Sequence, residues 1–273
     1  MNFIEKLLNA SRNNQSLLCI GLDPDAELMP DIDVFQFNRE IIDATSDIVC
    51  AYKPNLAFYE ALGIEGLKAM EKTVAHVPEG IPVIGDAKRG DIASSSKVYA
   101  RALFETFGFD AVTVNPYLGY DSVVPFIDYA DKGVFILCKT SNPGASDFQE
   151  SLCIDPDSNK GTRPLFELVA LKAREWNARG NVGLVVGATY SKQLRRIREI
   201  CPDLALLIPG VGTQGGDLAA AARYGVDASG EKAIINCSRQ ILYASRERDF
   251  ALAARREALN LRDQINRHLA TKR

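Results

Sequence analysis

The segment IPVIGDAKRGDIASSS, residues 81–96, passes from an apolar run directly into alternating charges. Its first half is short, contains β-branched residues and ends at a glycine, which is typical of a strand buried on both faces of a parallel sheet. Asp86, Lys88, Arg89 and Asp91 then stand within six positions. Such a cluster is either a solvated turn or part of a pocket, and the rest of the chain distinguishes the two.

Seven further apolar runs of the same kind recur along the chain, each closed by Gly, Pro, Asn or a charge. They are LLCIGLDP from Leu17, IVCAYKPN from Ile48, AVTVNPYL from Ala111, VFILCKTSN from Val134, VGLVVGATY from Val182, LALLIPGVG from Leu204 and AIINCSRQI from Ala233. Amphipathic helical stretches lie between or after them, at residues 35–48, 58–77, 164–180 and 251–269.

This alternation of strands and helices indicates parallel βα units with right-handed crossovers. Eight units in 273 residues favour an α/β fold with one closed (β/α)₈ TIM barrel, and a doubly wound sheet is the alternative. We therefore expect one domain over residues 1–273. It should begin with a short amphipathic helix rather than a signal peptide, and a long polar loop at about residues 142–162 is a lid or an excursion.

The composition limits the partners of the protein. A net charge of −3 and a pI near 5.6 give no basic footprint for nucleic acid. No apolar run approaches the roughly 20 residues of a membrane helix. Six cysteines without a CxxC pair predict a reduced, cytoplasmic protein. Two histidines nearly exclude a His-rich metal site or a Ser-His-Asp triad.

Polar side chains lie at or just beyond the carboxyl ends of the predicted strands. These ends surround one mouth of a barrel, which is where such folds build their active sites. The sequence therefore predicts a pocket lined by Asp23, Lys53, Asp86, Lys88, Asn115, Ser141, Gln214 and Arg239.

The spacing D-x-K-x-x-D predicts how the charges meet. In an extended chain Asp86 and Lys88 point to the same side. Asp91 begins the next helix, from which it reaches the same region or a neighbouring subunit, and Lys53 arrives from the second strand. Opposite charges about 4 Å apart gain roughly 4 kcal/mol at an effective dielectric near 20, which offsets part of their burial. The alternative is a salt-bridge belt that closes the barrel mouth.

The segments DAKRGDI and AYKPNLAFYE resemble the orotidine 5′-phosphate decarboxylase family. VNPYLGYDS, CKTSNPGA, VVGATY, LIPGVGTQGGD and NCSRQILYAS resemble its second subfamily, the longer bacterial-type (type 2) enzymes. The resemblance covers residues 17–245 and does not depend on one motif, since D-x-K-x-x-D also occurs in related sugar-phosphate barrels.

The resemblance implies a homodimer that converts orotidine 5′-phosphate to UMP and CO₂. The sequence has no thiamine, pyridoxal or metal-binding signature, so we expect no cofactor and no metal. Lys88 would stabilise a carbanion at C6 of the pyrimidine and then protonate it. Asp86 would lie near the departing carboxylate, and Lys53 and Asp91 would hold these two groups in register. Lys53 would also lie near the ribose. The family pattern brings the aspartate that matches Asp91 from the partner subunit.

The same resemblance implies the residues that bind the rest of the substrate. Asp23 matches a residue that binds a ribose hydroxyl, although an Asx turn is an equal alternative at this position. Ser141 should contact the pyrimidine ring. Ser95 stands where the family usually has threonine, so a hydroxyl is kept and a methyl group is lost. In the glycine-rich segment PGVGTQGG, Gln214 would close over the phosphate, and Arg239 would bind it bidentately.

Two other functions remain open at this level. A Mg²⁺-dependent sugar-phosphate decarboxylase or aldolase of the same suprafamily would also carry D-x-K-x-x-D, but it would have an acidic residue in place of Lys53. A catalytically silent nucleotide-binding module is the second alternative, and the four intact charged positions argue against it. Tyr117 and Tyr120 line either the mouth or a dimer contact.

Overall fold

The computed structural model describes residues 1–155, 161–212 and 215–270. Within them, eight parallel strands form one sheet in the order β2-β1-β10-β9-β8-β5-β4-β3. Isolated bridges from Tyr52 to Val83 and from Asn55 to Asp86 link its two end strands, so that the sheet closes. The strands are β1 (Leu18–Leu22), β2 (Ala51–Pro54), β3 (Ile84–Arg89), β4 (Ala111–Val114), β5 (Gly133–Lys139), β8 (Val182–Val186), β9 (Ala205–Ile208) and β10 (Ala233–Cys237). The predicted (β/α)₈ barrel is confirmed.

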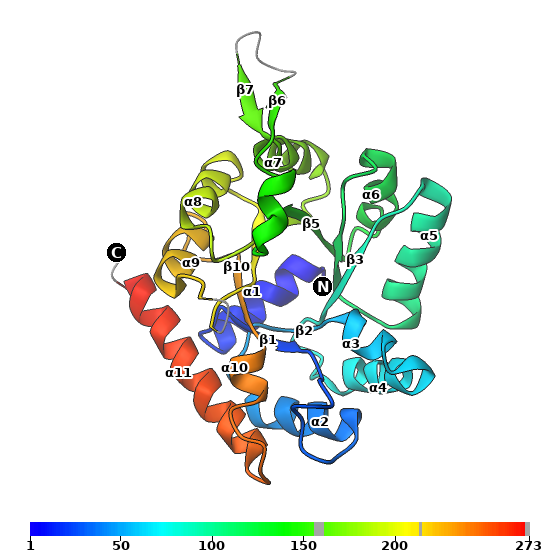
Figure 1. The fold of residues 1–273 in the computed structure, drawn as a ribbon, viewed down its shortest axis with the longest axis vertical. Coiled ribbons are helices and arrows are strands. Elements are labelled where there is room, and N and C mark those ends of the chain that lie inside the picture. The colour runs from blue at the N-terminus through cyan, green and yellow to red at the C-terminus, as the bar shows by residue number, and fades with distance from the viewer. Residues whose placement is uncertain (156–160, 213–214, 271–273) are drawn as a thin grey trace.

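Helices surround this barrel, and their apolar faces pack on the outer face of the sheet (Figure 1). Their bounds are α2 (Val34–Thr45), α3 (Leu56–Glu60), α4 (Gly63–His76), α5 (Ala93–Arg101), the π-helical turn η1 (Ala102–Thr106), α6 (Tyr120–Ile127), α7 (Leu165–Trp176), α8 (Ser191–Ile200), α9 (Leu218–Gly225), α10 (Arg239–Leu242) and α11 (Phe250–Ala270). None of the described helices is both long enough and apolar enough to cross a bilayer.

The stretch 58–77, predicted as one helix, belongs to two. Helix α3 ends at Glu60 and α4 begins at Gly63, whose φ of +65° is left-handed. Glycine adopts this conformation without the steric cost that a β-carbon imposes, so the chain turns there before the second helix begins. The amphipathic pattern continues across the turn because both helices face the same barrel.

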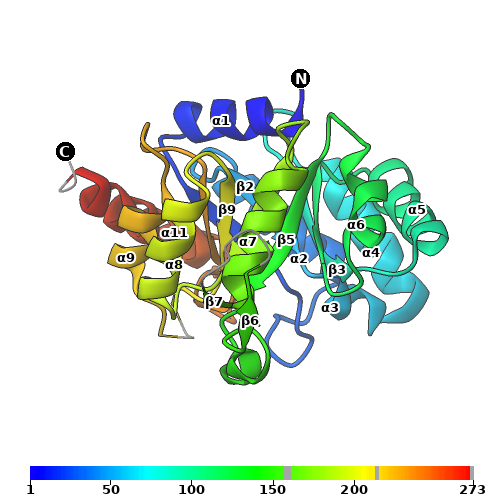
Figure 2. The ribbon, with the colours of Figure 1, turned by 90° about the horizontal axis from the view of Figure 1, so that it is seen from above.

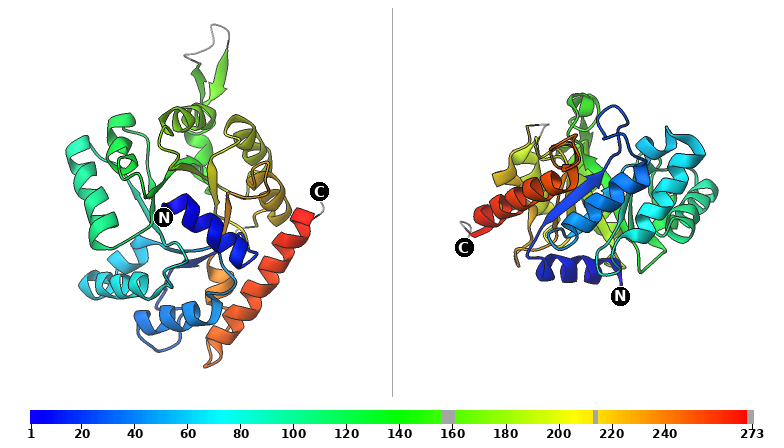
Figure 3. Two further views of the ribbon diagram at one scale, coloured as in Figure 1. Left: turned by 180° about the vertical axis from the view of Figure 1, so that it is seen from behind. Right: turned by 90° about the horizontal axis from the view of Figure 1, so that it is seen from below.

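Helix α1 (Phe3–Asn13) covers the amino-terminal end of the barrel (Figures 2 and 3). It begins with a capping box, in which the Asn2 side chain accepts from the Glu5 amide and the Glu5 side chain accepts from the Asn2 amide. Phe3 and Leu7 enter the barrel interior, where the Phe3 ring meets the edge of Phe135 with centroids 5.6 Å apart. One end of the barrel is therefore filled, and the carboxyl ends of the strands form the open end.

The segment between β5 and α7 leaves the barrel. It contains the 3₁₀ turn η2 (Pro143–Asp147) and the antiparallel strands β6 (Leu152–Ile154) and β7 (Thr162–Pro164). The two strands project beyond the ring of helices at the top of Figure 1. The main chain returns to the barrel at α7, where Leu165 donates from its amide to the Ser151 carbonyl.

Candidate active site

A cavity of about 740 Å³ opens at the carboxyl ends of the barrel strands. Its wall is half polar and half apolar, because Thr113 and Asn236 line it together with Leu137, Val185 and Leu207. Six of the predicted site residues line it as well, namely Asp23, Lys53, Asp86, Lys88, Ser141 and Arg239. The apolar strands therefore bring charges from distant parts of the sequence to one hollow.

Asp86 is the centre of a charged cluster in this cavity. Its Oδ2 accepts a 2.8 Å hydrogen bond from Lys53 Nζ, and its Oδ1 accepts a 2.6 Å hydrogen bond from Lys88 Nζ. Thr113 Oγ1 donates a third hydrogen bond of 2.8 Å to Oδ1. Within this cluster the two ammonium groups exceed the one carboxylate by one positive charge.

The three charged groups differ in their access to solvent. Lys53 is 4% exposed and Asp86 is 9% exposed, whereas about half of the Lys88 side chain is exposed. A buried ion pair is tolerated when the charges and their hydrogen bonds offset the desolvation, which the three bonds to Asp86 provide. Lys53 and Asp86 thus form a buried ion pair, and Lys88 extends from Asp86 toward the open cavity.

Burial and pairing act in opposite directions on the pKa values here. Burial alone would lower the pKa of the Lys53 ammonium, but Asp86 and Asp23 outweigh it and raise that pKa above its ordinary value. Burial would raise the pKa of Asp86, but Lys53 and Lys88 outweigh it and hold that pKa well below its usual range. Both groups of the buried pair are therefore charged at neutral pH.

The backbone at Lys88 departs from the extended geometry expected for the motif. Lys88 has a φ of +47°, and the pairing of β3 with β4 shifts register between Gly85 and Arg89. The Lys88 amide donates to Thr113 Oγ1 at 3.0 Å. A left-handed conformation costs an L-residue about 1–2 kcal/mol, and such strain is common at functional sites. Lys88 and Asp86 meet as expected, but through a strand irregularity that Thr113 holds.

Asn115, which was predicted to line the pocket, does not line this cavity, and neither do Asp91 and Ser95 within their own chain. Asp91 Oδ1 accepts from the Ile92 amide at 2.7 Å, and Ser95 lies in the first turns of α5. The sequence predicted an array of two ammonium groups and two carboxylates. Within one chain the array contains Lys53, Asp86 and Lys88, and it lacks the second carboxylate, Asp91.

Two buried oxygens on residues that line the cavity have no hydrogen-bond partner among the described residues. They are Asp23 Oδ1 and Asn236 Oδ1. The main chain at Asp23 is held in place, because Tyr243 donates from its hydroxyl to the Asp23 carbonyl at 2.7 Å. Buried acceptors are normally satisfied, so these two oxygens mark a place for a ligand that donates hydrogen bonds.

Arg239 begins α10 just after β10 and lines the cavity beside Pro209, Gly210 and Val211, which follow β9. Gly210 and Gly212 have φ values of +94° and +90°, so this loop uses backbone that other residues rarely adopt. A guanidinium beside a glycine-rich loop suits an oxyanion. Gln214, predicted to close over a phosphate, lies outside the described residues.

Sequence reasoning missed Thr113 and Asn236, because both lie inside runs that were interpreted as apolar strands. Threonine is a good strand former, which hides its hydroxyl in a pattern such as AVTV. A polar residue within a doubly buried strand was the available signal, since polar groups are rarely buried without a hydrogen-bonding role.

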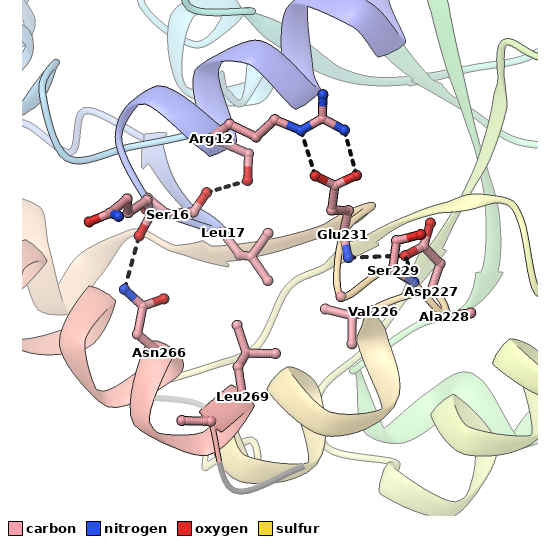
Figure 4. A pocket seen from close by; sticks show the side chains of 14 residues that line it. Arg12, Ser16, Leu17, Val226, Asp227, Ala228, Ser229, Glu231, Asn266 and Leu269 are labelled. Carbon is pink, nitrogen blue, oxygen red and sulfur yellow. Dashed lines mark hydrogen bonds and ion pairs between the residues drawn. The ribbon is translucent and has the colours of Figure 1, made fainter. Parts of the chain in front are cut away.

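A second cavity, also of about 740 Å³, lies where α1, α9 and α11 approach one another (Figure 4). Arg12 and Glu231 face each other there in a two-bond ion pair with N···O distances of 2.7 and 2.9 Å. Asp227 accepts from the amides of Ser229 and Glu231. The charged groups Arg12, Glu231 and Asp227 of this second cavity are thus bonded to protein atoms, in contrast to the two unpaired oxygens of the first cavity.

The donor set of the first cavity does not resemble a metal centre. In the described ranges, no group of three or more His, Cys, Asp or Glu side chains is arranged to hold a metal ion. Asp86, the acidic residue at the centre, has both oxygens engaged by ammonium groups.

Comparisons with known proteins show which family the chain resembles. Residues 16–254 match the model of the orotidine 5′-phosphate decarboxylase / HUMPS family. An orotidine 5′-phosphate decarboxylase of Dehalococcoides mccartyi strain BAV1 is 52% identical over 269 residues, which are 98% of each chain. One of Cupriavidus necator is 49% identical and covers 98% of this chain and 99% of its own.

Solved structures give the same result. The structure of Leishmania donovani OMP decarboxylase is 39% identical and superimposes with a TM-score of 0.84, covering 98% of this chain and 99% of its own. That of Leishmania donovani UMP synthase is 41% identical with a TM-score of 0.88, and the match covers 98% of this chain and 57% of that one.

Proposed function

The chain belongs to the orotidine 5′-phosphate decarboxylase family, and on that premise we propose that it converts orotidine 5′-phosphate to UMP and CO₂ in the last step of de novo UMP biosynthesis. One observation carries the proposal. A buried carboxylate, Asp86, is held between two ammonium groups at the floor of the open cavity, and one of these, on Lys88, extends toward solvent.

The reaction requires a negative charge on carbon to be stabilised. When the bond between C6 and the carboxylate carbon breaks, its electron pair remains on C6 and CO₂ departs. The Lys88 ammonium stabilises that pair and transfers a proton to C6, and Lys88 then regains a proton from water. Electrostatic stabilisation of this kind needs no cofactor and no metal.

Asp86 and Lys53 prepare this step. Asp86 holds the Lys88 ammonium by a 2.6 Å hydrogen bond and lies near the carboxylate that departs. Lys53 keeps Asp86 ionised by the second bond of 2.8 Å, and Thr113 orients the same carboxylate. An arrangement that is already organised before the substrate binds avoids the cost of reorganisation during the reaction.

The remaining groups bind the ends of the substrate. Asp23 has an orphaned buried oxygen, which supports a hydrogen bond from a ribose hydroxyl. Arg239 and the loop after β9 suit the phosphate, with Gln214 closing over it. Ser141 follows β5 at the cavity wall and contacts the pyrimidine ring. Ser95 supplies a hydroxyl in place of the usual threonine.

We further infer a homodimer in which Asp91 crosses to the active site of the partner. Asp91 and Ser95 lie at the start of α5, outside the cavity of their own chain. Exposed apolar side chains occur in and just before α5 and α6, namely Ile92, Val98, Tyr99, Tyr117, Leu118 and Tyr120. Exposed apolar side chains of this kind favour a protein contact, and a two-fold dimer would bring α5 of each chain to its partner.

Three finer assignments complete the proposal. The motifs VNPYLGYDS and LIPGVGTQGGD support the longer bacterial-type (type 2) subfamily. We treat residues 1–273 as one domain, with the segment at 142–162 as its excursion. The six cysteines are free thiols, five of them buried, which supports a cytoplasmic protein.

The decisive experiment follows the loss of orotidine 5′-phosphate absorbance with purified protein in the presence of EDTA. Wild type should turn over and Lys88→Ala should not, while circular dichroism shows both to be folded. Loss of wild-type activity with EDTA and recovery with Mg²⁺ would favour the metal-dependent sugar-phosphate enzymes. Binding of UMP without turnover in either protein would favour a silent nucleotide-binding module.

A further inference from the structure

Lys139 is a fully buried lysine that the proposed chemistry does not use. It is the last residue of β5 and is 0% exposed. Its Nζ lies 3.2 Å from Glu150 Oε1 and 3.9 Å from the centre of the Tyr190 ring. A carboxylate and an aromatic face both stabilise an ammonium, but burying a lysine remains costly, and an apolar side chain would avoid that cost.

Both partners of Lys139 are linked to the same short segment, Thr140–Asn142, one directly and the other through a neighbouring residue. The Tyr190 hydroxyl donates to the Asn142 carbonyl at 3.4 Å. Glu150 adjoins Gln149, whose side chain accepts from the Thr140 amide at 2.9 Å and donates to Thr140 Oγ1 at 2.7 Å. The buried ammonium therefore lies between Tyr190, which bonds to this segment, and Glu150, whose neighbour Gln149 bonds to it.

The segment Thr140–Asn142 forms part of the cavity wall. Thr140, Ser141, Asn142 and Gln149 line the cavity, whereas Lys139 does not. The segment also lies tightly on the end of β8, because a β-carbon at Gly187 would come within 2.8 Å of the Ser141 main chain. A small displacement of this segment would therefore move the cavity wall directly.

We propose that Lys139 is a positioning residue for the pyrimidine-binding segment Thr140–Asn142. Its ammonium draws Tyr190 and Glu150 together and so sets where Ser141 meets the base. The inference rests on the proposed function, since it takes Ser141 to contact the pyrimidine. Lys139 acts through Tyr190, Glu150 and Gln149, and not on the reacting atoms.

The test replaces Lys139 with methionine, which has a similar volume and no charge. Lys139→Met should raise KM for orotidine 5′-phosphate about 10-fold and weaken UMP binding in a calorimetric titration by a similar factor. We expect kcat to change less than about 3-fold and Tm not to fall, because a buried ion replaced by a packed apolar group is often neutral. The matched control is Lys68→Met, which removes an exposed Lys–Glu pair with an N···O distance of 2.8 Å.

A second variant separates positioning from folding. Tyr190→Leu should raise KM like Lys139→Met, and the double variant should be no worse than either single variant, because the two side chains act as one unit. Unchanged KM and unchanged UMP affinity in folded Lys139→Met would overturn the proposal. Should Lys139→Met not fold, normal UMP affinity in Tyr190→Leu would overturn it instead. UMP binding is measured without turnover, so the inference can fail or stand separately from the decarboxylase activity.

Discussion

Lys53 donates a 2.8 Å hydrogen bond to Asp86 in a layer of the barrel that solvent barely reaches. The same carboxylate accepts from Lys88, so that one negative charge lies between two positive charges. Removing the negative charge would leave the two ammonium groups without the carboxylate to which both of them are hydrogen-bonded.

Asp86→Asn should destabilise the fold as well as abolish activity. It keeps the shape of the side chain but removes the larger of the two counter-charges near the buried Lys53, which costs about 3–5 kcal/mol in the free energy of unfolding. Urea denaturation of both proteins measures this difference. Asp128→Asn is the control, because its exposed pair with Arg179 contributes at most about 1 kcal/mol. Equal losses in the two variants would contradict a special role for the buried pair.

The stability difference between wild type and Asp86→Asn should depend on pH in one direction. The folded-state pKa of Asp86 lies below its unfolded value, so its contribution is present above the unfolded pKa and is lost as pH falls through the folded pKa. The difference should therefore be constant above about pH 5 and narrow as pH falls below about 4. Urea denaturation at a series of pH values tests this, and a difference that widens on acidification would refute the assignment.

Thr113→Val should lower both stability and kcat. Valine preserves the shape but removes the hydroxyl that accepts from the Lys88 amide and donates to Asp86. Leaving these buried groups unpaired costs about 1–3 kcal/mol, and a displaced Lys88 should lower kcat by roughly 10-fold or more. Thr113→Ser keeps the hydroxyl and should retain most of the activity. If Thr113→Val matches wild type in kcat, Thr113 does not organise the catalytic lysine.

Mixing Lys88→Ala with Asp91→Ala protein should restore activity that neither has alone. Random exchange of subunits in a two-fold dimer makes about a quarter of the sites complete, because a hybrid combines Lys88 of one chain with Asp91 of the other. We expect about 25% of wild-type activity after exchange, with an unmixed sample of each variant as control. If mass spectrometry verifies the exchange of subunits and no activity is recovered, Asp91 belongs to the site of its own subunit.

Arg239→Ala should reduce kcat/KM for orotidine 5′-phosphate by about 10- to 100-fold, which is the effect of losing one or two charge-assisted hydrogen bonds. Steady-state kinetics with orotidine, which lacks the phosphate, provides the matched comparison. The variant and the wild type should be equally slow with orotidine. An equal loss with both substrates would show that Arg239 acts on something other than the phosphate.

The local patterns of the sequence determined the fold class and most of the cavity. Each buried strand appears as a short apolar run with polar residues at its carboxyl end, so that the sequence alone predicts Asp23, Lys53 and Asp86 at one mouth of the barrel. This succeeds because the side of a parallel sheet on which strands end follows from their direction alone.

Other features required the tertiary structure. The closure of the sheet by Tyr52 and Val83 and the left-handed Lys88 depend on register between strands distant in sequence. Asp91 is two residues from Arg89, yet the turn into α5 takes it away from the cavity of its own chain.

The sequence by itself thus determined that a strand-and-helix chain gathers lysines and aspartates at one end of a barrel. The tertiary structure alone decided which of them touch, that Thr113 joins Lys88 to Asp86, and that Lys139 is buried beneath the cavity wall. The physical reason is that hydrophobic periodicity is a local property of the chain. Hydrogen-bond partners and burial, in contrast, arise from contacts between residues that the sequence holds far apart.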